Sequence, residues 1–194
     1  MRRLIARWLD LPEAQTGRAL RMLALVLFLS AALALMKSAQ SGIFLAVCAR
    51  RDIPWAFAAS SITLAALSAF FVSLARRLST PRLAELALGS TALALLGLRV
   101  IVESASVWRA FLTYVVIESL SGVLVIQVWA VVTGATDART ARRLLPVAGI
   151  GSGIAWAIAG FVVAPLSEAF GAASLLLVAP VALLLGLVCV RALA

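Results

Sequence analysis

Six long apolar runs, separated by short polar connections, organise the chain. They cover residues 22–49, 53–75, 83–104, 107–133, 145–166 and 170–190. Each run is close to or above the roughly 20 residues that a helix needs to cross the hydrocarbon core of a bilayer. The runs are continuously apolar and lack the alternation expected of barrel strands, and helices otherwise satisfy every backbone polar group in lipid. The pattern predicts an all-α polytopic membrane protein with six transmembrane helices.

The connections are too short to form a second domain. We therefore expect one transmembrane domain over residues 22–194, preceded by a cytoplasmic segment over residues 1–21. One helical face of this segment carries Leu4, Ile5, Trp8 and Leu9. This face favours a helix lying flat on an anionic leaflet, although a solvated basic tail explains the same residues. A signal peptide is a weaker alternative, because Asp10 and Glu13 interrupt the leader.

Composition agrees with a location in lipid. Hydrophobic residues make up 64% of the chain and charged residues 13%, with a mean hydropathy of +1.11. A soluble domain carries about 25% charged residues, and a chain of this length could not bury so much apolar surface in water. The sequence has no histidine, and Cys48 and Cys189 form no metal-binding or disulfide pattern. We therefore expect no enzyme, no metal site and no cofactor.

The basic residues predict an orientation. Twelve of the 17 Lys and Arg residues fall on one side of the predicted membrane and four on the other, and the last one, Lys37, lies inside the first run. Cytoplasmic loops carry the excess of Lys and Arg, so we expect both termini in the cytoplasm of a multi-pass inner (plasma) membrane protein. The net charge of +9 is then explained by topology, and no nucleic-acid partner is expected.

Charges inside apolar runs indicate candidate chemistry, because they are costly in lipid and tend to mark function. Lys37 lies near the middle of the first run, and Glu118 lies near the middle of the fourth. A polar break follows the lysine, formed by Ser38, Gln40, Ser41 and Gly42. It favours locally adjusted backbone facing a cavity, where the Lys37 ammonium would attract an anionic substrate group.

Glu118 is the expected partner of Lys37, and it shares one helical face with Tyr114 and Gly122. The alternative is a buried ion pair that only locks two helices together. Gln127 lies nine residues after Glu118 and points to the opposite side of a straight helix. We expect Gln127 to make contacts between helices instead of lining the same cavity.

Glycines cluster in the fifth run, at Gly149, Gly151, Gly153 and Gly160. Small residues at this spacing let helix backbones approach closely, so these glycines predict helix packing. A phosphate-binding loop is not expected, because no strand precedes the glycines and no Lys-Ser/Thr pair follows them.

Two stretches carry a resemblance to known transporters. The segment Ser73–Leu83 resembles the basic loop of the major facilitator superfamily: Arg76, Arg77 and Arg82 match its basic positions, whereas its glycine and acidic residue are absent. The segment Asp137–Gly153 resembles the part of the nucleotide (ATP/ADP) translocase family where a basic loop leads into a glycine-rich fifth helix. The region around Lys37 is similar to that family too, although Gln40 and Ser41 replace its Arg-Asp pair.

The resemblance implies half of a transporter. Such proteins have twelve spans in two six-helix halves, and each half is a pair of three-helix inverted repeats. The implied function is transport of an anionic, nucleotide-like solute by alternating access, together with a second six-helix half from the same chain or another copy. The implied substrate-binding residues are Lys37, Gln40, Ser41, Tyr114 and Glu118, and the implied cytoplasmic gate is Arg76, Arg77 and Arg82. A non-transporting membrane anchor or sensor, or a small membrane interaction protein, are the alternatives.

Overall fold

The structure is a computed structural model that describes residues 13–102, 106–134, 136 and 138–193. Its long helices are α2 (Glu13–Val47), α3 (Ile53–Ala75), α4 (Thr80–Ile101), α5 (Val107–Gly134), α6 (Ala138–Phe170) and α7 (Leu175–Leu193). The short 3₁₀ turns η1 (Arg50–Asp52) and η2 (Ala172–Ser174) precede α3 and α7. In the part of the chain described, six helices are long and apolar enough to cross a membrane, as the apolar runs predict.

Local sequence explains where several helices begin and end. Pro54 and Pro81 lie in the first turns of α3 and α4, where a missing N–H breaks no helical hydrogen bond. Gly171 follows the last residue of α6 with a φ of 78°, a left-handed conformation that favours glycine, and turns the chain toward η2.

The starts of two helices, and the backbone after Lys37, differ from the sequence-based expectation. Helix α2 begins at Glu13, inside the segment expected to precede the membrane domain, and α6 begins at Ala138. Both extensions contain Ala, Arg and Leu, which are strong helix formers, so the helices run beyond the apolar windows. The polar break after Lys37 leaves α2 continuous to Val47, because a backbone in lipid has no better partner than its own helix. Residues 1–12 of the expected N-terminal segment lie outside the described residues.

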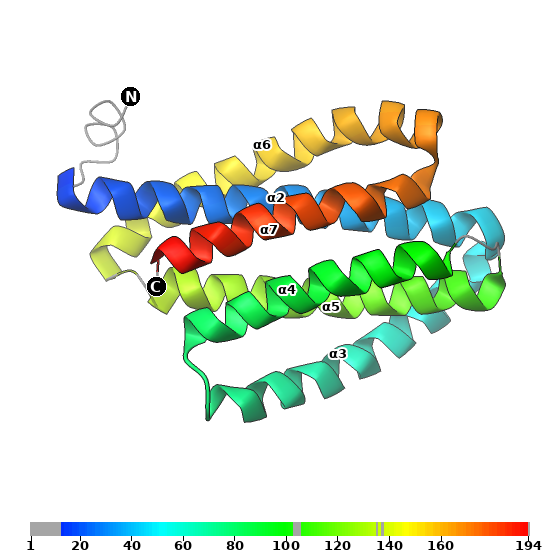
Figure 1. Ribbon diagram of the computed structural model, residues 1–194, viewed down its shortest axis with the longest axis horizontal. Coiled ribbons are helices and arrows are strands. Elements are labelled where there is room, and N and C mark those ends of the chain that lie inside the picture. The colour runs from blue at the N-terminus through cyan, green and yellow to red at the C-terminus, as the bar shows by residue number, and fades with distance from the viewer. Residues whose placement is uncertain (1–12, 103–105, 135, 137, 194) are drawn as a thin grey trace.

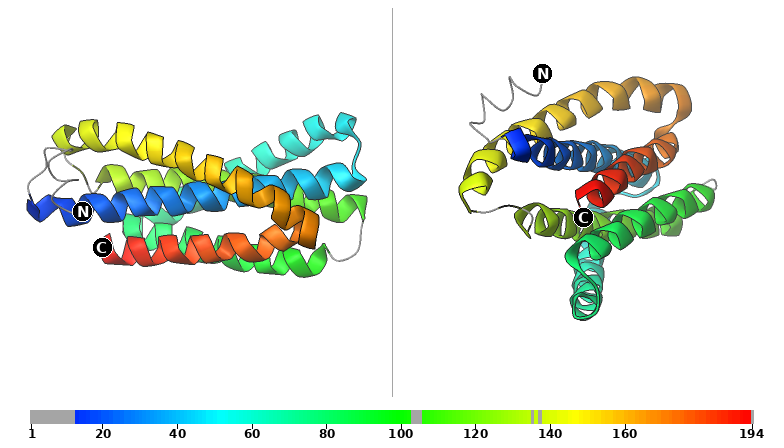
Figure 2. Two further views of the ribbon diagram at one scale, coloured as in Figure 1. Left: turned by 90° about the horizontal axis from the view of Figure 1, so that it is seen from above. Right: turned by 60° about the vertical axis from the view of Figure 1, so that its left-hand side comes forward.

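Four helices form a closed ring. Helix α2 packs along α7, α7 along α4, α4 along α5, and α5 along α2. The other two helices are attached to the outside, α6 on α2 and α3 on α5, and each makes few contacts with α7 and α4, respectively (Figure 2). In the most apolar stretches, 61% of α2 and 56% of α5 is buried, against 11% of α3 and 17% of α6. Most buried residues therefore belong to the ring. We call the side of α2 and α5 that points away from α4 and α7 the outer face, and α6 and α3 lie along its two borders.

The bundle has a basic end. The start of α2, the α3–α4 and α5–α6 connections and the end of α7 lie together at one end of the molecule (Figure 1). The described arginines at this end, which we call the basic end, are Arg18, Arg21, Arg76, Arg77, Arg82, Arg142 and Arg191. The opposite end carries Arg50, Arg51, Arg99 and Arg109. This arrangement is the one that the clustering of basic residues between the apolar runs predicts.

Two close approaches between elements depend on glycine. A Cβ atom on Gly42 of α2 would lie 2.8 Å from the Cβ of Ala172 in η2. A Cβ atom on Gly122 of α5 would lie 2.9 Å from the Cδ atoms of Leu64 in α3. Leucine methyl groups can rotate away, but the Cβ of Ala172 cannot move without its backbone. Gly42 is therefore the glycine at which any larger residue forces the structure to shift.

We expect Gly42→Ala to lower the stability of the protein in detergent by about 1 kcal/mol. Overpacking costs about 1–3 kcal/mol, and the better helix propensity of alanine offsets part of that cost. Thermal unfolding followed by circular dichroism measures the change. The matched control is Gly149→Ala, because no atom lies within 4 Å of the Cβ position at Gly149 and the same helical gain applies. Equal effects of the two substitutions would contradict the assigned contact.

Candidate functional site

The candidate site is an ion pair between the two central helices. Lys37 Nζ of α2 donates a hydrogen bond to Glu118 Oε2 of α5, and the two side chains form a salt bridge. Lys37 lies ten residues before the end of α2 and Glu118 eleven residues after the start of α5, at the same end of the bundle. At 1.5 Å per helical residue, both lie about 15 Å from that end, a distance equal to half the thickness of a hydrocarbon core of about 30 Å.

A third polar side chain completes the cluster. Gln40 Nε2 donates to the same Glu118 Oε2 oxygen at 2.7 Å, and the Gln40 side chain is 2% exposed. The other amide atom, Gln40 Oε1, is buried and has no hydrogen-bond partner in the structure. One carboxylate oxygen thus accepts two bonds from α2, while a buried acceptor beside it lacks a donor. A buried carbonyl of this kind leaves a hydrogen bond to be gained by a ligand or water.

The ion pair is not sealed inside the ring. The side chains of Lys37 and Glu118 are 31% and 25% exposed. Exposed and half-buried positions of α5 recur at Phe111, Glu118, Val125 and Trp129, which lie on one side of the helix. The pair therefore opens toward the outer face that α3 and α6 flank.

Aromatic packing supports the site toward the nearer end of the bundle. Phe44 of α2 and Tyr114 of α5 have ring centroids 4.9 Å apart at an interplanar angle of 56°. Phe44 is fully buried and Tyr114 half-buried, one helical turn from Glu118. Ser41 is exposed on the same side of α2 as Lys37. The structure thus brings Lys37, Gln40, Tyr114 and Glu118 together, with Ser41 at the border of the cluster.

Two hydroxyl contacts attach the flanking helices to α2 and α5. Ser30 Oγ of α2 donates to Ser152 Oγ of α6 at 2.8 Å. Ser119 Oγ of α5 donates to the Ser60 carbonyl of α3 at 3.0 Å and also to the Val115 carbonyl of its own helix. Sequence reasoning missed these contacts and Phe44. Helical spacing could have found part of them, because Ser30 and Phe44 lie seven residues before and after Lys37, two turns away on one face.

The three arginines of the α3–α4 connection lie apart from the ion pair. Arg76, Arg77 and Arg82 are exposed at the basic end. Within the described part of the chain, their side chains make no hydrogen bond or salt bridge, so they are available to water, lipid or another protein. The gating role expected for them stays a prediction.

The glycines of α6 do not create close approaches within the chain. No atom lies within 4 Å of the Cβ position at Gly149, Gly151, Gly153 or Gly160. Close packing instead involves Gly42 and Gly122, which the small-xxx-small pattern did not single out. Packing of the α6 glycines against a second copy or another six-helix half stays a prediction.

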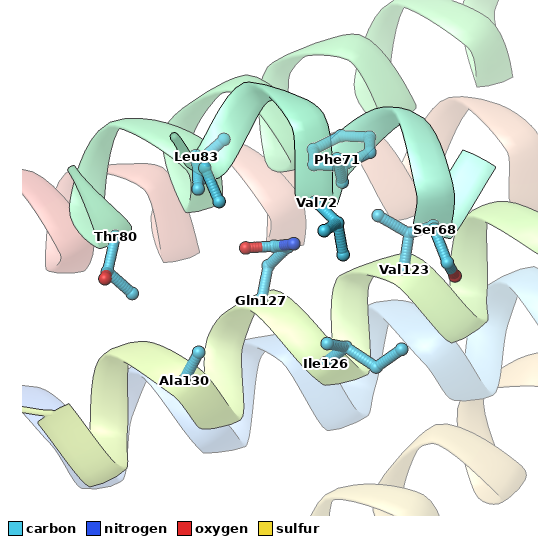
Figure 3. Close-up of a pocket in the computed structure, with 10 residues that line it drawn as sticks. Ser68, Phe71, Val72, Thr80, Leu83, Val123, Ile126, Gln127 and Ala130 are labelled. Carbon is cyan, nitrogen blue, oxygen red and sulfur yellow. The ribbon is translucent and has the colours of Figure 1, made fainter. Parts of the chain in front are cut away.

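Gln127 lies on the opposite side of α5 from Glu118, as its spacing predicts, but it lines a separate cavity and makes no hydrogen bond to another helix among the described residues. The cavity has a volume of about 320 Å³ between α3, α4 and α5, at their basic ends. Figure 3 shows the Gln127 side chain reaching from α5 toward α4, with Leu83 on one side and Phe71 and Val72 on the other. Gln127 is 9% exposed, and nearly all other lining residues are apolar. This cavity and the ion pair are thus two different sites on opposite sides of α5.

Compared with known proteins, the chain matches no family model, no curated protein and no solved structure. The resemblance to the major facilitator superfamily and to nucleotide translocases therefore stays a prediction from the sequence.

We expect removal of one partner of the ion pair to cost more than removal of both. Lys37→Met or Glu118→Leu leaves an unpaired charge in an apolar setting, which costs at least about 2.5 kcal/mol. The double variant has no charge to bury and should recover most of the lost stability. Thermal unfolding in detergent, analysed as a double-mutant cycle, measures the coupling.

The exposed pair between Arg191 Nε and Glu85 Oε2, at 3.3 Å, provides the matched control. Glu85→Leu should change stability by less than about 1 kcal/mol, because water screens exposed pairs. Additive effects of the Lys37 and Glu118 substitutions would show that the two residues do not stabilise each other.

Proposed function

We propose that the protein is half of a membrane transporter that moves an anionic solute, nucleotide-like in chemistry, by alternating access. The observation that carries this proposal is the Lys37–Glu118–Gln40 cluster, placed at mid-depth and open to the face between α3 and α6. Charged residues at that depth are costly and commonly mark solute pathways. The two side chains are about one-quarter to one-third exposed, so a solute could reach them from the surface of the ring.

The pattern of helix contacts supports a repeat of three helices. Suppose that α2 is exchanged with α5, α3 with α6 and α4 with α7. Each extensively packed pair of helices then becomes another extensively packed pair or stays the same pair. The α2–α6 contact becomes α5–α3, and α2–α7 becomes α5–α4. The sparse α3–α4 contact becomes the equally sparse α6–α7 contact. Three-helix repeats run in opposite directions through a membrane, so this exchange is the one that inverted repeats would produce.

The repeat makes α2 and α5 equivalent, and these two helices supply the charged residues of the site. Binding sites between inverted repeats lie near the bilayer midplane, where the repeats meet. In this proposal an anionic group of the substrate takes the place of Glu118 at the Lys37 ammonium. Gln40 Nε2 then donates its hydrogen bond to the anion that lies beside Lys37, whether this is Glu118 or the substrate. Tyr114 lies next to this anion, and Ser41 contacts the substrate from the exposed side.

A second six-helix half covers the outer face in this proposal. The faces of α3 and α6 expose large apolar side chains, among them Trp55, Phe57, Ile62, Ile154 and Phe161. The second half comes from the same protein or from another copy, and the α6 glycines contact it. Arg76, Arg77 and Arg82 hold the cytoplasmic gate closed in one state, in an inner (plasma) membrane with both termini in the cytoplasm.

The second candidate is a non-transporting anchor or sensor of the same fold. The observation that favours it is the ion pair itself, because Lys37 and Glu118 neutralise each other without a solute. The two candidates differ in whether an anion competes for Lys37.

We expect anions to stabilise the wild-type protein and not the Lys37→Met/Glu118→Leu double variant. The probes are ADP, ATP and inorganic phosphate, added to purified protein in detergent during thermal unfolding. A ligand at one hundred times its dissociation constant stabilises by about 2.7 kcal/mol. The Glu85→Leu/Arg191→Met variant is the control and should respond like the wild type. If anions stabilised the double variant as much as the wild type, Lys37 would not be part of the binding site. If anions did not stabilise the wild type, the result would favour the non-transporting anchor or sensor.

The proposed orientation has its own test. With Cys48 and Cys189 replaced by alanine, single cysteines are introduced at Ala49 and Ser79, which are exposed at opposite ends of the bundle. A membrane-impermeable maleimide added to intact cells should label Ala49→Cys and should label Ser79→Cys only after the membrane is opened. Labelling of position 79 in intact cells would reverse the proposed orientation.

A further inference from the structure

Two neighbouring cavities lie at the basic end of the bundle. The first is the cavity of about 320 Å³ that contains Gln127. The second has a volume of about 250 Å³ and lies among the start of α2, the start of α4 and the ends of α5 and α7. Thr80 and Ala130 line both cavities, so the two adjoin each other. Their linings differ in chemistry, because the first is almost entirely apolar and Arg18 lines the second.

The Gln127 amide is the strongest sign of a ligand in the first cavity. The residue is 9% exposed, and Figure 3 shows its amide directed into the cavity. Within the described part of the chain, the amide makes no hydrogen bond. The amide faces the cavity without a protein partner there, so the side chain is suited to a ligand that brings a carbonyl or hydroxyl oxygen.

The second cavity favours a negatively charged group. Arg18, which is exposed, is one of its lining residues, and α4 begins beside it at Thr80. The N-cap residue of α4, Ser79, makes no side-chain capping hydrogen bond, and Pro81 has no N–H, so the N–H groups of Thr80 and Arg82 are the ones left in the first turn. A helix N-terminus of this kind attracts anions, and Arg77 and Arg82 are exposed on the same connection.

We propose that the two cavities together bind one anionic membrane lipid. Its charged headgroup lies at Arg18 and the N-terminus of α4, an ester carbonyl accepts a hydrogen bond from Gln127 Nε2, and an acyl chain fills the apolar cavity. The chain leaves the cavity past Val72 and Ile126, which line it and are 64% and 55% exposed. Helix α3 makes few contacts with α4, and in this proposal the acyl chain passes between them into the surrounding lipid. The proposal is independent of transport.

The polar groups determine which lipid binds. An acyl chain that moves from the bilayer into an apolar cavity exchanges one apolar environment for another and gains little from the hydrophobic effect. Selection therefore depends on the headgroup charge and on the bond to Gln127. We expect an anionic lipid to bind at least tenfold more tightly than a zwitterionic lipid with the same acyl chains.

The experiment measures lipid binding to the full chain in detergent by native mass spectrometry. The probes are dioleoyl phosphatidylglycerol and dioleoyl phosphatidylcholine, which differ only in the headgroup. Wild type should retain one phosphatidylglycerol molecule. Arg18→Gln should weaken that binding about fivefold and leave phosphatidylcholine unchanged, since one arginine near an anionic lipid contributes about a factor of five. Arg142→Gln, an exposed arginine at the same end outside both cavities, is the matched control and should have no effect.

Gln127→Leu separates a ligand contact from a structural contact. The lipid proposal expects phosphatidylglycerol to bind about fivefold more weakly, while the unfolding temperature without lipid is unchanged or higher, because a buried polar group without a partner has been removed. Should this variant fail to fold, Ala130→Phe fills the junction of the cavities without removing a polar group, and it should abolish the bound lipid. Equal affinity for the two lipids, or unchanged phosphatidylglycerol binding in Gln127→Leu or Ala130→Phe, would overturn the proposal.

Discussion

An ammonium or a carboxylate alone in hydrocarbon raises the free energy of the protein by several kcal/mol. The packing of the helices is therefore constrained to bring Lys37 and Glu118 into contact. Their contact places α2 and α5 side by side at one depth, and Gln40 adds a second bond to the same carboxylate oxygen. The other helices pack around this pair, with α7 and α4 completing the ring on one side and α6 and α3 attached on the other.

Much of this arrangement could be predicted from the sequence, because few backbone structures are stable in a bilayer. Long apolar runs in a bilayer must be helices, and two lone charges of opposite sign in such runs must pair. The same periodicity that placed Tyr114 beside Glu118 placed Gln127 on the other side of α5. These predictions depend on positions within one helix, where geometry is regular, and on a single long-range contact that electrostatics requires.

The remaining features depend on contacts that no local pattern encodes. The start of α2 at Glu13 could not be predicted from the apolar run, because hydropathy reflects the free energy of transfer to lipid and does not report helix propensity. The closest approaches between elements are at Gly42 and Gly122, whereas the α6 glycines face open space. A glycine permits close packing only where another element lies against it, and the sequence pattern does not show where that happens. The cavity at Gln127 lies between three helices, of which α3 and α4 make few contacts with each other, and this arrangement is visible only once the packing is known.

The closure of the ring also sets an order of assembly. Helix α2, the first of the ring to be synthesised, has its most extensive contact with α7, the last. Leu25 of α2 and Leu88 of α4 both lie close to Gly186 of α7, so these contacts form only after α7 has entered the bilayer. Synthesis proceeds at about 5–20 residues per second. The earlier helices therefore spend several seconds in the bilayer before α7 arrives and the ring can close.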